Sequence, residues 1–527
     1  MPHDCYWPII YVRGYAMSRG EMDDTTADPF CGFNLGSTVM RARPDKSEPP
    51  KKFVFESPVV RLQSDFGYCD IYEDGVDIVD PDWKGGVKRR SIVIHRYYDD
   101  ASTLLGSGKT PSMETFAKEL SELILRVRDR VCSVPENKVD LKDFRCYLVA
   151  HSMGGLVCRA FLQNPDAGDT DARACVDKFF TYATPHNGID VAGVNAPEWL
   201  GLNDISNFSR DRMADYLGIQ DLYETLEPKR VDWLPEECLS IDRVFCMIGT
   251  NRSDYEAAAG LSRTFVGHGS DGLVRIDNAA LWGVKDRTTV TRPAARAYTY
   301  RSHSGRYGIV NSEEAYQNLA RFLFGDLRVD IWVDIADVFV PEELEEADKN
   351  GTLDALYQIE VSASPLGKRW LLTRRVAEED SVACRRHADL RNKPDERKVY
   401  LSTAFLANRD RVDNDNSLSY GLSLGIRVPD YEVEKRFWPN RHYEGQYLFR
   451  DALALRMVPP AKPGDAWQVF HDWQSDNVGQ ASVPVAVSAL QGGKVEVVIP
   501  FSNSDATPPR SPGIAGQVRF VVSLWNQ

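Results

Sequence analysis

The chain has 527 residues, of which 43% are hydrophobic and 27% charged, as in ordinary globular proteins with large cores. This length exceeds a single typical domain, so we expect two large units. The net charge of −14 repels phosphate backbones and argues against nucleic-acid binding. None of the ten cysteines forms a C-x-x-C pair, which argues against a zinc ribbon or a thioredoxin-like motif.

The amino terminus, MPHDCYWPIIYVRGYA, has no basic segment ahead of a long apolar run, so we predict no secretory signal. No stretch approaches the apolar length that spans a bilayer. Several cysteines lie inside apolar runs, which suits a reducing compartment. We therefore expect a cytoplasmic protein by default, and export without an amino-terminal signal stays open.

Short apolar runs alternate with helical patterns up to about residue 325. In chain order, strands are expected at 8–12, 90–98, 144–150, 177–184, 243–250 and 296–302, and helices at 111–131, 153–164 and 312–325. Strands separated by helices predict an α/β fold with a mostly parallel sheet covered on both faces. For the first of these helices we expect Thr110 as the cap and Pro111 as the first helical residue.

Two stretches interrupt this alternation. Residues 15–88 form a long insertion after the first strand, and residues 186–240 form a second one. Long insertions in a compact domain are often functional. We consider two alternatives for them, a lid or cap over a site and surface decoration.

After residue 325 the pattern changes to short strands. The run LRVDIWVDI (327–335) alternates strictly between apolar and polar residues, and five further runs of this kind follow up to residue 527. Many short alternating strands are typical of an antiparallel β-sandwich. We therefore predict a catalytic α/β domain at 1–325 and a β-sandwich-like accessory domain at 326–527.

Two serines fit a hydrolase nucleophile motif. Ser423 lies in G-L-S-L-G and matches the strict G-x-S-x-G pattern, whereas Ser152 lies in A-H-S-M-G. A serine nucleophile of this type needs a sharp turn between a strand and a helix. Ser152 has that context, while the residues around Ser423 alternate as in a strand. We predict that Ser152 is the nucleophile.

Four segments together resemble bacterial lipases and esterases of the α/β-hydrolase fold. VAHSMGGLVCRAF (149–161) is similar to their nucleophile turn, and YATPHNG (182–188) to the stretch after the next strand. GHGSDGLVRIDNA (267–279) resembles their acid segment, and SHSGRYGIVNSEEAYQNLARFL (302–323) their histidine loop and last helix. The segments follow the Ser, Asp, His order of this fold. The resemblance covers about residues 8–325 and nothing beyond.

The resemblance implies a role for each matching residue. Ser152 would be the nucleophile, His303 the general base, and Asp271 the carboxylate that orients His303. Asp254, which is closer to the end of its predicted strand, is the rival acid. We prefer Asp271 because Asp-Gly-Leu-Val matches the lipase segment.

An oxyanion hole needs two backbone N–H donors. The resemblance implies that Met153 gives one, and that the loop after the first strand gives the other. The lipases that the chain resembles carry His-Gly-x in that loop, whereas this chain has Arg13-Gly14-Tyr15. Tyr15 is then the expected second donor.

No cofactor and no metal site are predicted. His186 is interpreted as a structural residue, with a metal role as the alternative because some of these lipases hold zinc near their cap. The spaced carboxylates at 413–417 lack the glycine and glutamate of an EF-hand.

The function predicted from these residues is that of a lipase or esterase acting on an ester or lipid substrate. An apolar acyl site under the second insertion would involve Trp199, Leu200 and Leu202, whose alternative is core packing. An acyltransferase, a phospholipase, delivery as a toxin effector, and an inactive binding protein stay open. The β-domain could contact a membrane surface or a protein partner, and the sequence does not indicate an oligomeric state.

Overall fold

The structure is a computed structural model of the chain. It describes residues 6–14, 38–42, 51–55, 57–71, 83–95, 97, 111–191, 194–195, 208–252, 269–303, 308–376, 383–411, 417–433, 441–458, 460, 465–475, 483–502 and 511–526. The chain divides into two compact units, Asp4–Leu323 and Phe324–Gln527. That the chain has two separate domains with a boundary at residue 325 stays a prediction.

The first unit is built on a seven-stranded sheet in which every neighbouring pair of strands is parallel. Its strands, in sheet order, are β14 (Ala295–Thr299), β11 (Val244–Gly249), β7 (Val176–Tyr182), β6 (Cys146–His151), β1 (Ile9–Val12), β5 (Ser91–His95) and β4 (Cys69–Asp70). The prediction of an α/β fold with a parallel sheet is confirmed.

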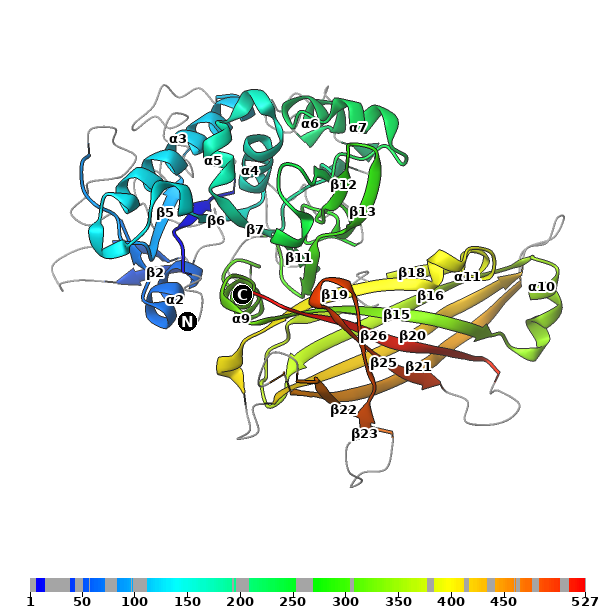
Figure 1. Ribbon diagram of the computed structural model, residues 1–527. Coiled ribbons are helices and arrows are strands. Elements are labelled where there is room, and N and C mark those ends of the chain that lie inside the picture. Colours follow the sequence, from blue (N-terminus) through cyan, green and yellow to red (C-terminus); the bar gives the residue numbers. More distant parts are fainter. Residues whose placement is uncertain are drawn as a thin grey trace. The chain divides into compact units, whose positions relative to one another are not determined.

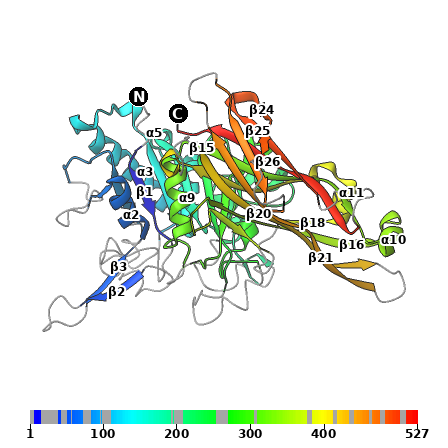
Figure 2. The ribbon, with the colours of Figure 1, turned by 90° about the horizontal axis from the view of Figure 1, so that it is seen from below.

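Helices cover both faces of this sheet. Helices α3 (Met113–Cys132), α4 (Met153–Gln163) and α5 (Thr170–Ala174) lie on one face, and α2 (Ser57–Phe66) and α9 (Glu313–Phe324) lie on the other (Figure 1; Figure 2). Successive side chains of β7 point to opposite faces of the sheet, and both faces are apolar. Phe179 lies in the buried cluster that also contains side chains of α3 and α4. The next residue, Phe180, points the other way and packs on Phe322 of α9 with ring centroids 5.9 Å apart.

The start of α3 differs from the prediction. The helix begins at Met113, and Ser112 is its N-cap, with a side chain that accepts a hydrogen bond from the Thr115 amide. The expected cap, Thr110, lies outside the described residues. Ser112 takes this role because its hydroxyl stands directly before the first helical residue.

The two predicted insertions contribute regular structure to the first unit. Within 15–88, α2 covers the sheet and β4 pairs in parallel with β5, so this part belongs to the body of the fold. The same stretch holds the hairpin β2 (Thr38–Ala42) and β3 (Lys51–Phe55). Within 186–240 lie β8 (Asp190–Val191), β9 (Val194–Asn195), α6 (Arg210–Tyr216), α7 (Gln220–Thr225) and β10 (Trp233–Pro235).

Strand β10 belongs to a small separate sheet. It pairs with β12 (Trp282–Lys285), which pairs in turn with β13 (Thr289–Pro293). The hairpin of β12 and β13 was not predicted, because its sequence does not alternate cleanly between apolar and polar residues. This small sheet ties the second insertion to the segment between the predicted acid and histidine.

The second unit is β-rich and antiparallel. One sheet has the order β19 (Lys398–Leu406), β15 (Leu327–Phe339), β26 (Gly513–Leu524), β25 (Val495–Ser502) and β24 (Val487–Ala489). The other has the order β17 (Thr373–Arg375), β16 (Leu353–Pro365), β20 (Leu418–Val433), β21 (Arg441–Val458), β22 (Gln468–Trp473) and β23 (Val483–Val485), with β18 (Ala383–Arg386) also on β16. Short helices α10 (Glu345–Lys349) and α11 (His387–Asn392) complete it, and its long strands run from yellow-green to red in Figure 1.

One buried cluster contains side chains of both sheets of the second unit. The alternation predicted for 327–335 is confirmed, because Leu327, Val329, Ile331, Val333 and Ile335 all lie in this cluster. Inward side chains of β20 and β26 belong to the same cluster, so the two sheets share a core.

Two further observations concern membrane-spanning helices and the cysteines. None of the helices in the described ranges has the length and apolarity that a bilayer crossing requires. Eight cysteines lie in those ranges, and all eight are free thiols.

Candidate active site

Ser152 occupies a strained turn between strand β6 and helix α4. All six residues of β6 are buried, and α4 begins at Met153. Between them the Ser152 backbone has φ 50° and ψ −127°, a conformation that residues other than glycine rarely adopt. The Ser152 amide donates to the Tyr182 carbonyl at 2.9 Å, which holds the turn against β7. The Ser152 side chain makes no capping bond to α4, so its hydroxyl is available for another partner.

Small residues beside Ser152 let the neighbouring backbone pass. A β-carbon at Gly154 would lie 2.2 Å from the Arg13 carbonyl oxygen and 2.5 Å from that of Val12, at the end of β1. A β-carbon at Gly14 would lie 3.2 Å from the β-carbon of Ser152. The loop after β1 therefore passes directly beside the serine, as the close packing of a nucleophile turn requires.

The Gly154→Ala variant is expected to lose stability because its new methyl group would overlap the backbone of β1. We expect a loss of about 3 kcal/mol in the free energy of unfolding, measured by urea denaturation. Gly421→Ala is the matched control, because the nearest atom to its new β-carbon is the Ser364 hydroxyl oxygen at 3.9 Å. A Gly154→Ala midpoint equal to that of the control would contradict the packing argument.

His303 joins Ser152 to Asp271 through both ring nitrogens. His303 Nε2 lies 2.9 Å from Ser152 Oγ, and His303 Nδ1 lies 2.9 Å from Asp271 Oδ2. The three side chains are buried, with relative exposures of 5%, 1% and 1% for Ser152, His303 and Asp271. The structure thus brings together the three residues that the sequence analysis selected as nucleophile, base and acid.

Backbone contacts fix the carboxylate of Asp271. Its Oδ1 accepts hydrogen bonds from the amides of Leu273 at 3.0 Å and Val274 at 2.8 Å. Its own carbonyl accepts from the His303 amide at 2.9 Å. Gly249 at the end of β11 makes room for it, because a β-carbon there would lie 2.9 Å from that of Asp271. The two amides therefore hold Oδ1 and leave Oδ2 facing the imidazole.

The hydroxyl, imidazole and carboxylate form one hydrogen-bonded chain. A neutral imidazole that donates from Nδ1 to a carboxylate presents a lone pair at Nε2. That lone pair can accept the proton of Ser152 when the hydroxyl oxygen attacks an electrophile. The arrangement has the chemical parts of a base-activated serine.

Most of the other predicted site residues lie outside the described part of the chain. Tyr15, the expected second oxyanion donor, lies outside the described residues, and so does the rival acid Asp254. The described part of that loop ends at Gly14. The three candidate acyl-site residues also lie outside it: Trp199, Leu200 and Leu202. Met153, the other expected donor, is the first residue of α4 and is buried.

His186 lies in a buried polar setting. Its Nε2 is 3.2 Å from the Thr181 hydroxyl oxygen, and burial, with a smaller contribution from Arg159, holds its pKa well below the ordinary value. In the part of the chain that the structure describes, no three His, Cys, Asp or Glu side chains gather as metal ligands would. Most of the carboxylate run at 413–417 lies outside that part.

Arg159, a buried arginine on α4, was not among the predicted site residues. Its guanidinium donates to the carbonyls of His186 at 2.8 Å, Val231 at 2.7 Å and Trp233 at 2.9 Å. Burial lowers its pKa to about 10. The contact ties the turn after β7 and the strand β10 to the helix that follows Ser152. A lone arginine in the apolar run GGLVCRAFL was the available signal.

His151, directly before Ser152, was also not among the predicted site residues. Its ring is fully buried and lies beside that of His303, with centroids 4.9 Å apart. Its Nε2 is 2.9 Å from the His303 carbonyl oxygen. A polar residue that ends the apolar strand CYLVAH was the signal in the sequence.

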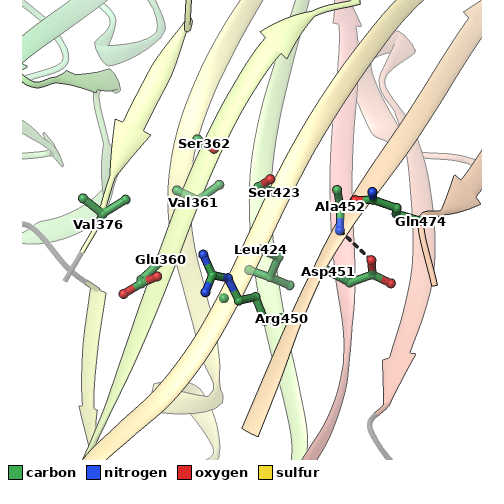
Figure 3. Close-up of a pocket in the computed structure, with 11 residues that line it drawn as sticks. Glu360, Val361, Ser362, Val376, Ser423, Leu424, Arg450, Asp451, Ala452 and Gln474 are labelled. Carbon is green, nitrogen blue, oxygen red and sulfur yellow. Dashed lines mark hydrogen bonds between the residues drawn. The ribbon is translucent and has the colours of Figure 1, made fainter. Parts of the chain in front are cut away.

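Ser423 is in a different environment, in the middle of strand β20. It pairs with Ser362 of β16 and Ala452 of β21 and is exposed. It lines a hollow of about 430 Å³, where its neighbours include Glu360 and Arg450 (Figure 3). None of the residues described around this hollow is a histidine. The strict motif therefore lacks both the strand–helix turn and an imidazole base.

Comparisons with known proteins found no matching family model and no matching curated protein. Among solved structures, the Bacillus licheniformis lipase BlEst2 in mature form is 15% identical, covering 58% of this chain and 89% of that chain, with a TM-score of 0.27. Phospholipase PlaB from Legionella pneumophila is 13% identical, covering 84% and 91%, with a TM-score of 0.28. Its complex with thio-NAD is 12% identical, covering 88% and 91%, with a TM-score of 0.27.

Proposed function

We propose that this chain is a serine hydrolase of the α/β-hydrolase fold that cleaves carboxylic esters through an acyl-enzyme. The observation that carries the proposal is the continuous hydrogen-bonded chain from Asp271 through His303 to Ser152. Its two links of 2.9 Å lie on buried side chains beside a strained strand–helix turn. A structural role alone gives no reason for a strained serine that faces an imidazole.

The proposed reaction begins with attack by Ser152 Oγ on the ester carbonyl carbon. The serine proton moves to His303 Nε2, and Asp271 stabilises the resulting imidazolium as a carboxylate. The imidazolium then gives its proton to the leaving alcohol, so an acyl-serine remains. A water molecule, deprotonated by His303, then attacks the acyl carbon. The bond to Ser152 Oγ breaks, the imidazolium returns its proton to that oxygen, and the carboxylic acid leaves.

The negative charge of each tetrahedral intermediate needs N–H donors. We propose the amides of Met153 and Tyr15 for this role. The first lies at the amino-terminal end of α4, where the helix dipole also favours an anion. For the second, the support is that Gly14, directly before Tyr15, packs against Ser152.

The acceptor and the substrate class belong to this proposal. A lipase or esterase transfers the acyl group to water, while an acyltransferase with the same three residues would transfer it to an alcohol. Product analysis in the presence of competing alcohols separates the two. Phospholipase activity is tested by the same product analysis with a phospholipid as substrate.

We also propose that the β-rich unit is an accessory domain that contacts substrate, membrane or partner.

The first test is labelling with a fluorophosphonate ester, which phosphonylates an activated serine. We expect labelling of wild type at Ser152, identified by peptide mapping, because His303 is placed to take its proton. Ser152→Ala should abolish the label. Ser423→Ala is the matched control and should keep it.

Two outcomes would contradict the proposal. Label on Ser423 would mean that the strict motif identifies the nucleophile. No label on folded wild type, both with and without detergent, would favour the inactive binding protein over the hydrolase.

A further inference from the structure

The His151 ring lies between two segments that border Ser152, the backbone of His303 and the loop after β1. It ends strand β6, and its ring is completely buried. On one side its Nε2 lies 2.9 Å from the carbonyl oxygen of His303. On the other side a β-carbon at Gly14 would lie 2.6 Å from its Nδ1. The ring therefore fills the space between the residue that carries the imidazole base and the loop after β1.

The contact to His303 defines the protonation of His151. A carbonyl oxygen only accepts hydrogen bonds, so His151 Nε2 carries the proton and donates it. Burial, and then the nearby His303, hold the pKa of His151 well below its ordinary value. His151 is thus neutral when His303 receives a proton from Ser152. The His151 ring, whose centroid lies 4.9 Å from that of His303, therefore adds no second positive charge beside that cation.

Both backbone polar groups of His303 are held by hydrogen bonds. Its amide donates to the Asp271 carbonyl at 2.9 Å, and its carbonyl accepts from His151. His303 follows strand β14 in a segment without regular secondary structure. These two contacts hold its backbone on both sides, one from Asp271 and the other from the residue directly before Ser152.

We propose that His151 is a positioning residue for the proposed reaction: its Nε2–H holds the His303 backbone while its ring spaces that backbone from Gly14. The inference rests on the proposed function of Ser152 and His303. Without the hydrogen bond, His303 Nε2 would no longer be held at 2.9 Å from the serine hydroxyl. A misplacement of about 1 Å can reduce a rate by about 100-fold.

The test compares His151→Gln with His151→Leu. A glutamine amide can reach the His303 carbonyl, whereas leucine has similar bulk and no donor. We expect His151→Leu to lower kcat about 10- to 100-fold with little change in KM, and His151→Gln to restore most of that loss. Rates are divided by the number of active sites, titrated from the burst of acyl-enzyme formation. This division separates positioning from a loss of folded protein.

Further variants keep the test informative if His151→Leu does not fold. His151→Asn retains an amide but is one methylene too short to reach the carbonyl, so it should behave like leucine. His471→Leu, at a half-buried histidine of β22 in the second unit, is the control and should match wild type. The inference is overturned if kcat per titrated site is the same in His151→Leu and wild type, or if His151→Gln and His151→Asn lose activity equally. A wild type that does not label at Ser152 contradicts the proposed function instead.

Discussion

Asp271→Asn is expected to reduce kcat by about 10⁴-fold while the protein stays folded. The reason is the fixed orientation of the side chain. The amides of Leu273 and Val274 both donate to Oδ1, so an asparagine must place its carbonyl oxygen there. Its NH₂ group then faces His303 Nδ1 and donates to it. This forces the imidazole proton onto Nε2, where it faces Ser152 and cannot accept the serine proton.

The measurement is ester hydrolysis by Asp271→Asn beside Asp254→Asn, the matched change at the rival acid. Asp254→Asn should hydrolyse the ester like wild type. Melting temperatures of both variants check that the effect is on catalysis. A normal rate in Asp271→Asn, or a loss in Asp254→Asn, would overturn the assignment of the acid.

The local part of the site could be predicted from the sequence. A buried strand, Ser152 and an apolar helix stand next to one another along the chain, and this order alone indicates the turn. The choice of Ser152 over Ser423 followed from the same local reasoning. The strand that this reasoning predicted around Ser423 is confirmed, because Ser423 lies within β20 and its neighbours Leu422 and Leu424 belong to the core.

Contacts between distant residues could not be predicted in this way. His151 meets a carbonyl that lies 152 positions away, and Arg159 meets carbonyls that lie 27, 72 and 74 positions away. Such partners depend on the order of strands in the sheet, which apolar periodicity does not encode. The same limit explains why β4 was not predicted. Its two residues lie inside a predicted insertion, and they form an edge strand only because β5 lies beside them.

The β-rich unit illustrates the difference between elements and topology. Strict alternation in 327–335 predicts a strand with one buried face. It does not predict that β15 lies between β19 and β26, whose residues come much later in the chain. Pairing between strands so far apart in the chain depends on the core that the two sheets share. The sequence therefore allowed the fold class to be predicted but not the order of the strands.

The first unit is expected to lose stability steeply as pH falls from 6.5 towards 4. His95, His151 and His186 are all buried, and burial is the main cause of their low pKa values, about 4 for His95. In the unfolded chain each would titrate near 6.5. Below pH 6.5 the unfolded state therefore binds more protons than the folded state. The contribution of each histidine to the free energy of unfolding is present above that pH. It falls by about 1.4 kcal/mol for each further pH unit below it.

Carboxylates change the stability at a lower pH than the buried histidines do, so the two contributions can be measured separately. Hydrogen bonding to Arg287 lowers the pKa of Asp221, so its contribution is present above about pH 4 and is lost only as pH falls further. The measurement is urea denaturation between pH 7.5 and 5, with hydrogen exchange of β6 and β20 peptides to attribute the loss to the first unit. His95→Leu should flatten the pH dependence by about one third, because one of the three protons no longer binds on unfolding. Equal stability at both ends of this range, or an unchanged slope in His95→Leu, would show that the buried histidines do not carry the effect.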